Sequence, residues 1–274
     1  WTANQAGIKV PNTVYTPGGV AAFKKMKKKL GSGASAFASP AGFATSFPDF
    51  GFRVNVGGKK IDIHVEYKAD AKAQMGSMRD WHFDGKKFIT PNPTPEKTDL
   101  ISIMNESTDC VKNGKRLLKD FKTFFDPSIT KIYSGMLSVE SDKNVRKAKM
   151  ERFVKGTKNY QLANIDNTTM GNHIIEHYKN KFNKEVKKDA DYSILLMMLG
   201  DSISLVTTKG RAPAGAMDAI CAMLGVKSIP KLTGLKAKLE VRIQPRGMTG
   251  GSKPPSIDVM ANFRLSGKPP GVNI

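Results

Sequence analysis

Alternating apolar and polar residues give the clearest structural signal in the first third of the chain. In residues 61–68 (IDIHVEYK), four apolar positions alternate with four polar ones, which is typical of a strand with one polar face. Residues 50–56 (FGFRVNV) and 60–68 are predicted to be two strands, because Gly57-Gly58 between them is a strong hairpin signal. The sequence therefore predicts a hairpin that presents four polar side chains on one face.

The last third of the chain carries the same signal. The stretches YSILLMML and SISLVTT flank Gly200-Asp201, which is a second hairpin signal. LKAKLEVRIQP (235–245) and SIDVMANFRL (256–265) each place their apolar residues on a single face. We therefore expect a β-rich C-terminal part that is built mostly from antiparallel hairpins.

Helical periodicity and glycine or proline breaks place the remaining elements. A short helix with a lysine-rich face is predicted over 18–30, and 96–125 are predicted as one or two helices that join at Gly114. We also predict helices for the basic stretch 143–155, the amphipathic stretch 170–183 and the apolar stretch 214–225, a short strand for 86–90, and loops for 31–47 and 69–85. This mixture predicts a single α+β (mixed α/β) domain over residues 1–274, with no linker clear enough to divide it.

Charge is the first functional clue. The 274 residues include 44 Lys and Arg against 24 Asp and Glu, a formal net charge of +20, and the pI is near 9.9. The excess is dispersed, since residues 1–48 hold no Asp or Glu and residues 202–274 hold eleven Lys or Arg against three acids. Such a chain fits a polyanionic partner, for which nucleic acid is the usual candidate.

Composition excludes several other classes. With 39% hydrophobic and 25% charged residues, the chain is expected to fold as a globular protein. Its longest purely apolar run, Ile194 to Leu199, has six residues, far short of the ~20 that a membrane span needs, and no secretory signal is visible. Cys110 and Cys221 form no disulfide framework, which fits a reducing compartment. These features predict a cytoplasmic protein without a membrane partner.

Two acids face each other across the predicted hairpin. If the two glycines form a two-residue turn, the register places Asp49 directly opposite Glu66, with Cβ atoms roughly 4.5–5.5 Å apart. Carboxylates this close repel unless a cation lies between them, and hard oxygen ligands suit Mg²⁺ or Mn²⁺. Lys68 points to the same face as Glu66, where an ammonium can orient a water or stabilise charge on a phosphate. Two acids, a lysine and a metal in a basic protein predict phosphodiester hydrolysis.

These residues resemble the active-site motif of the PD-(D/E)xK nuclease superfamily. The match consists of Pro48-Asp49, a hairpin, and Glu66-Tyr67-Lys68, so a catalytic hairpin spans 48–68. The resemblance implies a restriction-endonuclease-like core, with a central mixed sheet, β-hairpins and flanking helices, and a DNA endonuclease that depends on Mg²⁺ (or Mn²⁺). It implies Asp49 and Glu66 as metal ligands, the carbonyl of Tyr67 as a further ligand, and Lys68 as the residue that serves the attacking water. Many members also have an acid in the first helix, and this chain has none before Asp49.

Two more polar residues share the face of Glu66. Asp62 is an alternative partner acid, but it lies about 13 Å along the strand from Glu66, too far to share one metal. The register places it opposite Arg53, so we expect a salt bridge. His64 can contact a phosphate or be a surface histidine, and we favour the surface histidine.

Basic and polar residues elsewhere are candidates to hold the nucleic acid. Lysines of the N-terminal helix and basic residues of 143–155 suit phosphate contacts, and AQMGSMRDWHFDG (73–85) suits phosphate or base contacts. In that last stretch Trp81 or His82 could stack on a base, or Trp81 anchors an ordinary loop. The candidates are Lys24, Lys25, Lys28, Gln74, Ser77, Arg79, Arg146 and Lys147.

The expected partner is DNA, with RNA left open. A homodimer is compatible with this function, since cutting both strands with one site per chain usually takes two chains. A compact basic nuclease suits a bacterial cell, as a phage-encoded or a defence protein.

Two other readings stay open. Residues 173–177 (HIIEH) match the inverted zinc-peptidase motif, in which two histidines and a downstream ligand bind zinc, although a basic amphipathic helix explains the stretch as well. A non-catalytic nucleic-acid-binding protein would show the same charge. No Walker loop, dinucleotide fingerprint or serine-hydrolase elbow appears in the sequence, which argues against NTP-driven and serine-hydrolase activities.

Overall fold

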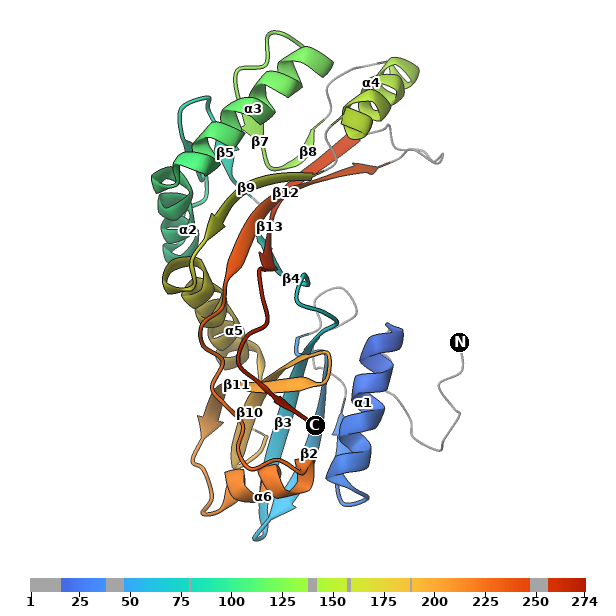
Figure 1. Ribbon diagram of the computed structural model, residues 1–274, viewed down its shortest axis with the longest axis vertical. Helices are drawn as coiled ribbons and strands as arrows, with labels where there is room; N and C mark the ends of the chain where they lie inside the picture. Colours follow the sequence, from blue (N-terminus) through green and yellow to red (C-terminus); the bar gives the residue numbers. More distant parts are fainter. Residues whose placement is uncertain are drawn as a thin grey trace. The chain divides into compact units, whose positions relative to one another are not determined.

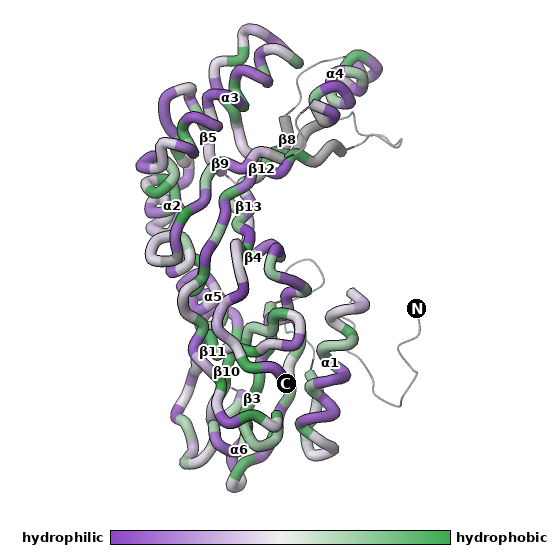
Figure 2. Tube along the Cα trace, in the orientation of Figure 1, coloured by the Kyte–Doolittle hydropathy of each residue, from purple (hydrophilic) through white to green (hydrophobic). Residues whose placement is uncertain are grey.

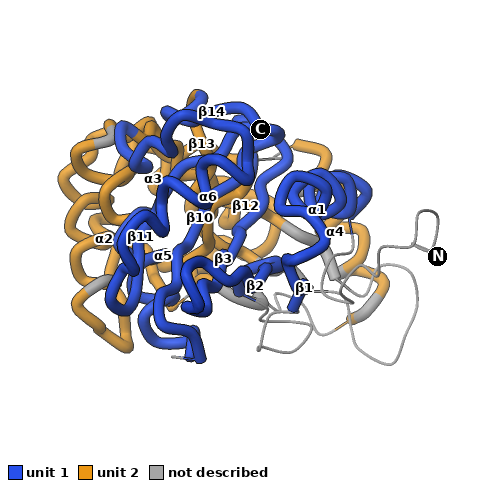
Figure 3. The backbone as a smooth tube through the Cα atoms, turned by 90° about the horizontal axis from the view of Figure 1, so that it is seen from below, with its two compact units in different colours: residues 1–73, 174–234, 268–274 blue, residues 74–173, 235–267 orange. Residues whose placement is uncertain are grey.

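In a computed structural model the chain forms six α-helices and three β-sheets within the residues that the structure describes (Figure 1). These residues are 16–37, 47–78, 80–137, 142–156, 159–187, 189–246 and 256–274. They fall in two units, each assembled from separate stretches of chain (Figure 3). Unit 1 comprises 1–73, 174–234 and 268–274, and unit 2 comprises 74–173 and 235–267. Neither unit is continuous in sequence, so no single boundary along the chain separates them.

All five helical stretches predicted from the sequence are found. The helices are α1 (Pro17–Leu30), α2 (Pro95–Glu106), α3 (Thr108–Phe124), α4 (Lys143–Gly156), α5 (Asn172–Glu185) and α6 (Ala216–Leu224), with a π-helical turn at Asn167–Gly171. Among these described segments, no helix has the length and hydropathy that crossing a membrane requires.

Unit 1 is built on a mixed six-stranded sheet in the order β1-β2-β3-β10-β11-β14. The strands are β1 (Ser35–Phe37), β2 (Phe50–Val56), β3 (Lys59–Lys68), β10 (Tyr192–Leu199), β11 (Ser202–Gly210) and β14 (Val272–Asn273). β3 and β10 run parallel, and the other neighbouring pairs are antiparallel. The parallel pair makes this the mixed sheet that was expected, and the long connection between β3 and β10, which contains residues 74–173, permits the crossover.

The β2–β3 hairpin has the register that the sequence predicts. Gly57 and Gly58 both have positive φ, 56° and 77°, which a two-residue type I′ turn requires and which glycine adopts without strain. Arg53 consequently lies opposite Asp62. The acids and bases of β3 are therefore positioned by two residues at the turn.

The sheet of unit 1 has an apolar and a polar face at β3. Ile61, Ile63 and Val65 are buried in one core with side chains of α1 and α6. The polar side chains of β3 alternate with these and point to the other face, where Tyr178 and Phe182 of α5 pack against them. β10 is buried along its whole length, and its trace is mainly hydrophobic (Figure 2). The polar face of β3 is thus enclosed rather than exposed to solvent.

Unit 2 contains two smaller sheets. The five-stranded sheet has the order β4-β13-β12-β9, and β8 also pairs with β13. The three-stranded sheet has the order β6-β5-β7. The clean alternation of 235–245 and 256–265 is confirmed, because β12 and β13 pair in register and bury their apolar sides. The strands are β4 (Gln74–Met78), β5 (His82–Phe83), β6 (Phe88–Ile89), β7 (Ile132–Tyr133), β8 (Gly135–Leu137), β9 (Asn159–Ile165), β12 (Ala237–Arg246) and β13 (Ser256–Leu265).

Three local predictions are wrong. The expected loop 31–47 contains strand β1, with 38–46 outside the described residues, and the expected irregular stretch 69–85 contains β4 and β5. The junction between α2 and α3 lies at Ser107, whose hydroxyl accepts a hydrogen bond from the Cys110 N–H and caps α3. Gly114 lies inside α3, where a Cβ atom would come within 3.0 Å of the Phe83 and Phe88 rings, so this glycine permits close packing rather than a break.

Candidate active site

Asp49 lies one residue before β2 and is bonded directly to β3. Its carboxylate accepts a hydrogen bond of 2.7 Å from the backbone N–H of Tyr67. The regular ladder between β2 and β3 ends with Phe50 opposite Val65. Beyond this pair, the Asp49 carboxylate rather than a backbone carbonyl accepts the next hydrogen bond from β3. This bond holds Asp49 at the end of β3 where Glu66 lies, as the hairpin register predicts.

The carbonyl of Tyr67 faces the same side. In an antiparallel pair a residue directs both its N–H and its C=O toward the same neighbouring strand, so the Tyr67 carbonyl projects toward Asp49. The Lys68 carbonyl points the opposite way, because it accepts a hydrogen bond of 2.8 Å from the backbone N–H of Gly200 beyond β10. The two carboxylates and the Tyr67 carbonyl therefore lie at one end of the hairpin.

Glu66 and Lys68 form an ion pair on the polar face of β3. The Lys68 Nζ lies 2.7 Å from the Glu66 Oε1, and the two side chains are only 16% and 9% exposed. They lie two residues apart on one strand, so their side chains project in the same direction. Both side chains are thus shielded from solvent, unlike the exposed ion pairs that contribute little to folding stability.

Helix α5 contributes residues that the sequence analysis did not assign to the site. The ring of Tyr178, only 4% exposed, has its centroid 5.8 Å from the Lys68 Nζ and 5.9 Å from the ring centroid of Phe47. Lys181 on the next turn places its Nζ 4.9 Å from the Phe47 centroid. Tyr178 thus lies near Lys68 and packs on the segment that carries Asp49. The spacing of Tyr178, Lys181 and Phe182 places them on one face of a helix. It does not indicate which strand that face covers.

The charges of the site perturb one another. Burial and then the nearby Glu66 raise the pKa of Asp49 to about 6, although the Tyr67 N–H, Lys68 and Lys181 oppose the shift. Burial also raises the pKa of Tyr178 above its ordinary value. Burial alone would lower the pKa of Lys68, but Tyr178 and Glu66 outweigh it, so the ammonium is retained. A cation placed between Asp49 and Glu66 would reduce the repulsion between their carboxylates.

The donor atoms fit a hard divalent cation. Asp49, Glu66 and the Tyr67 carbonyl offer oxygen ligands, which suit Mg²⁺ or Mn²⁺. Within the described ranges, no three His, Cys, Asp or Glu side chains gather in a way that could hold a metal ion. Mg²⁺ usually takes only one or two carboxylates and completes its shell with water and substrate phosphate, so two acids and a carbonyl are adequate.

The other polar residues of β3 have different surroundings. The expected Arg53–Asp62 salt bridge is confirmed, with two hydrogen bonds of 2.6 and 2.7 Å. The expectation of a surface His64 is wrong, because its ring is 3% exposed and has Phe37 and Phe182 on its two sides, with ring centroids 5.1 and 5.4 Å away. Gly51 lies beside His64 on β2, and since it has no side chain the Phe37 ring lies over it and covers the histidine.

The predicted nucleic-acid contacts are distributed over both units. The lysines of α1 lie on the helix that packs on the apolar face of the sheet, so they are not beside Glu66, and Lys25 pairs with Asp201 at 3.0 Å. Arg79 and the side chain of Arg146 lie outside the described residues. Trp81 is buried against Phe88, which agrees with the structural alternative for this residue and not with stacking on a base. The remaining candidates are Lys24 and Lys28 in unit 1, and Gln74, Ser77 and Lys147 in unit 2.

The HIIEH stretch forms the first turns of α5. Glu176 pairs with Lys179 at 2.6 Å, and the ring of His177 lies 5.9 Å from that of Tyr178. The absence of a third ligand among the described side chains gives this stretch no support as a zinc site.

The chain was compared with protein-family models, with curated proteins and with solved structures, and none of the three comparisons finds a match. The geometry of unit 1 therefore carries the functional assignment.

Proposed function

We propose that the protein is a metal-dependent endonuclease of the PD-(D/E)xK type that hydrolyses phosphodiester bonds in DNA. The observation that carries this proposal is the bond between Asp49 and the backbone of Tyr67, which brings the acid to the Glu66–Lys68 pair. The mixed sheet of unit 1, with its hairpins and with helices on both faces, agrees with the restriction-endonuclease-like core that the motif implies.

Each residue has a distinct role in this proposal. Asp49, Glu66 and the Tyr67 carbonyl hold Mg²⁺, which when bound supplies positive charge to the phosphate and lowers the pKa of water. Lys68 orients the attacking water and stabilises charge on the phosphate. Tyr178 restricts the Lys68 side chain, because its buried ring lies next to the ammonium.

The proposal is tested by cleavage of plasmid DNA with Mg²⁺, with Mn²⁺ and with EDTA. We expect metal-dependent cleavage by the wild type, and a loss of about 10²–10⁴-fold in rate for Asp49→Asn, Glu66→Gln and Lys68→Met. The matched control is Glu176→Gln on α5, which removes an acid of an ion pair whose side chain is 56% exposed and should leave the rate unchanged.

Three outcomes would contradict the proposal or its site. Wild-type protein that cuts nothing with either metal overturns the activity. Variants at Asp49, Glu66 and Lys68 that cut at the wild-type rate overturn the site. Loss of activity in Glu176→Gln would instead support a zinc site at the HIIEH stretch.

The net charge of +20 favours a second candidate, a nucleic-acid-binding protein without catalysis. It predicts salt-dependent binding to DNA with no cleavage under any metal condition. The same plasmid assay, combined with a mobility shift, separates the two functions.

A further inference from the structure

Helix α3 of unit 2 carries a row of cations along its exposed side. The cations recur three and four residues apart, over about 15 Å of a helix that rises ~1.5 Å per residue. The opposite side of α3 is buried, with Leu117 and Phe121 among its buried residues. All five cations are exposed, and together they form the α3 stripe: Lys112, Lys115, Arg116, Lys119 and Lys122.

Side-chain contacts fix α3 against the rest of unit 2. The Asn113 amide donates hydrogen bonds of 3.0 Å to the backbone carbonyls of Gln161 and Leu162 on β9. Near the other end of the helix, the ring of Phe121 packs against that of Phe153 on α4, with the two centroids 5.0 Å apart. The stripe therefore lies on an element that is already held in place, so its charges are preorganised for a ligand.

The cations of the stripe lack acidic partners. Within the described ranges no ion pair involves any of the five, whereas Lys179 on α5 pairs with Glu176. Of the two acids of α3, Asp120 accepts a hydrogen bond from the Tyr160 hydroxyl, and Asp109 lies in the first turn. Like charges at these spacings repel one another and do not stabilise a helix, so a role in folding does not explain the stripe.

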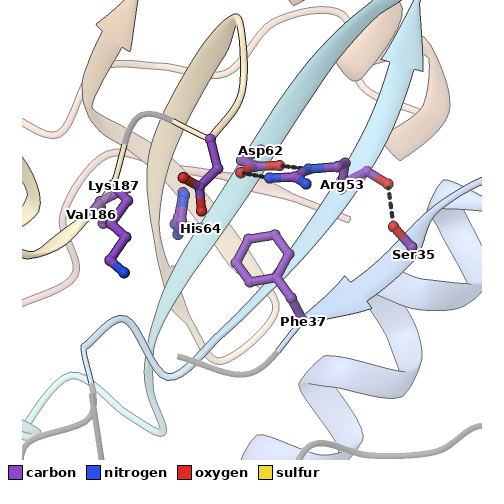
Figure 4. A pocket seen from close by; sticks show the side chains of 8 residues that line it. Ser35, Phe37, Arg53, Asp62, His64, Val186 and Lys187 are labelled. Atoms are coloured by element: carbon purple, nitrogen blue, oxygen red, sulfur yellow. Dashed lines mark hydrogen bonds and ion pairs between the residues drawn. The ribbon is translucent and has the colours of Figure 1, made fainter. Parts of the chain in front are cut away.

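Arg116 has its guanidinium held by an aromatic ring. The Cζ atom of Arg116 lies 4.7 Å from the centroid of the Tyr160 ring. Its side-chain N–H groups donate no hydrogen bond to any residue that the structure describes. Arg53 in unit 1 differs, because it donates two hydrogen bonds to Asp62 (Figure 4). An arginine that is held in place with its donors unused is suited to bind two oxygens of a phosphate.

The chemistry of the stripe distinguishes between kinds of partner. Helices that lie on membranes bind through their apolar face, and that face of α3 is buried. Protein interfaces are depleted of charge at their centre, whereas the stripe is charged throughout. Asn113 and Thr123 donate hydrogen bonds to backbone carbonyls, so they do not read base edges. Lysine binds phosphate as a point charge, so the stripe suits a row of phosphates.

We infer that the α3 stripe binds the phosphate backbone of a nucleic acid and holds it without regard to base sequence. The inference rests on one part of the proposed function, that the partner is nucleic acid, and does not depend on cleavage. It adds a contact surface in unit 2, whereas Asp49, Glu66 and Lys68 lie in unit 1. These five residues were not among the nucleic-acid contacts expected from the sequence.

The test is the binding of a labelled DNA duplex of random sequence, measured by fluorescence anisotropy in EDTA at several salt concentrations. The stripe variant is Lys112→Gln/Lys115→Gln/Lys119→Gln, because glutamine has nearly the helix propensity of lysine and no charge. We expect this variant to bind DNA at least about tenfold more weakly than wild type at moderate salt. The slope of log affinity against log salt should become shallower by about 2–3, since each lost phosphate contact removes about 0.9.

The matched control removes the same charge from three exposed lysines of unit 1, Lys60→Gln/Lys227→Gln/Lys231→Gln. It should bind DNA within about threefold of wild type, because these lysines lie outside the stripe. Urea denaturation of both variants checks that each is folded. Vesicles that contain phosphatidylserine are titrated in parallel, and the stripe variant should change their binding no more than the control does.

Three results overturn the inference: the stripe variant binds DNA as tightly as wild type, both variants lose the same affinity, or the loss appears with vesicles and not with DNA. Failure of the proposed function looks different. The binding assay contains no metal, so a protein that never cuts plasmid can still show the loss of binding. If the protein cuts plasmid with Mg²⁺ while the stripe variant binds DNA normally, the nuclease proposal stands and the stripe fails.

Discussion

Asp62 and Glu66 are both acidic, both nearly buried and four residues apart on the same face of β3, yet their surroundings are opposite. Asp62 is matched by Arg53, whose guanidinium makes two hydrogen bonds to one carboxylate. Glu66 pairs with Lys68, and the pKa of nearby Asp49 is raised by burial and then by Glu66, while Lys68 and Lys181 oppose the shift. Asp62 is thus matched in charge by its own guanidinium partner, whereas Asp49 and Glu66 repel each other beside the ammonium groups of Lys68 and Lys181.

The largest expected effect comes from breaking the matched pair. Arg53→Met leaves the Asp62 carboxylate, whose side chain is 6% exposed, buried without its partner. We expect the free energy of unfolding to fall by about 2–3 kcal/mol, measured by urea denaturation. The double variant Arg53→Met/Asp62→Leu removes both charges and should recover most of the loss. A single variant as stable as wild type would show that Asp62 does not depend on Arg53.

Removal of the Asp49 charge should change stability in the opposite direction. Because the folded-state pKa of Asp49 is about 6 against an ordinary 3.8, the protonated carboxyl stabilises the fold at low pH, and this contribution is lost as pH rises through about 6. Asp49→Asn keeps an acceptor for the Tyr67 N–H and removes the charge. It should raise stability by about 1–2 kcal/mol at pH 8, with the gain shrinking to near zero below pH 3.8.

Thermal or urea unfolding of Asp49→Asn at several pH values checks this sign. A variant that is less stable than wild type at pH 8 would mean that the Asp49 charge is already compensated in the metal-free protein.

The smallest expected effect concerns metal affinity. Protons compete with Mg²⁺ for Asp49, so the affinity measured by calorimetry should fall by up to tenfold per pH unit below about pH 6 and level off above it. Asp49→Asn should bind Mg²⁺ more weakly and lose this dependence. Wild-type affinity that stays constant from about pH 8 down to about pH 5 would remove Asp49 from the metal site.

Local sequence patterns predicted the elements that have a strong turn signal or a clean alternation of apolar and polar residues. The two-glycine turn fixed the register of β2 and β3, and clean alternation predicted β12 and β13. The short strand β1 was missed, since three residues at a sheet edge carry little periodicity. A helical pattern with a glycine inside it predicts a junction at Gly114, but this glycine allows the close approach of the distant Phe83 and Phe88 rings instead.

Which residues of β2 and β3 face each other follows from local sequence alone, because a hairpin register is set by its turn and side chains alternate with period two. That reasoning placed Asp49 by Glu66 and Asp62 by Arg53. The side chains that cover this hairpin come from tertiary packing: α5 brings Tyr178 to Lys68, and Phe37 lies over Gly51 and buries His64. These contacts join segments far apart in the chain, and packing between such segments leaves no periodic trace in the sequence.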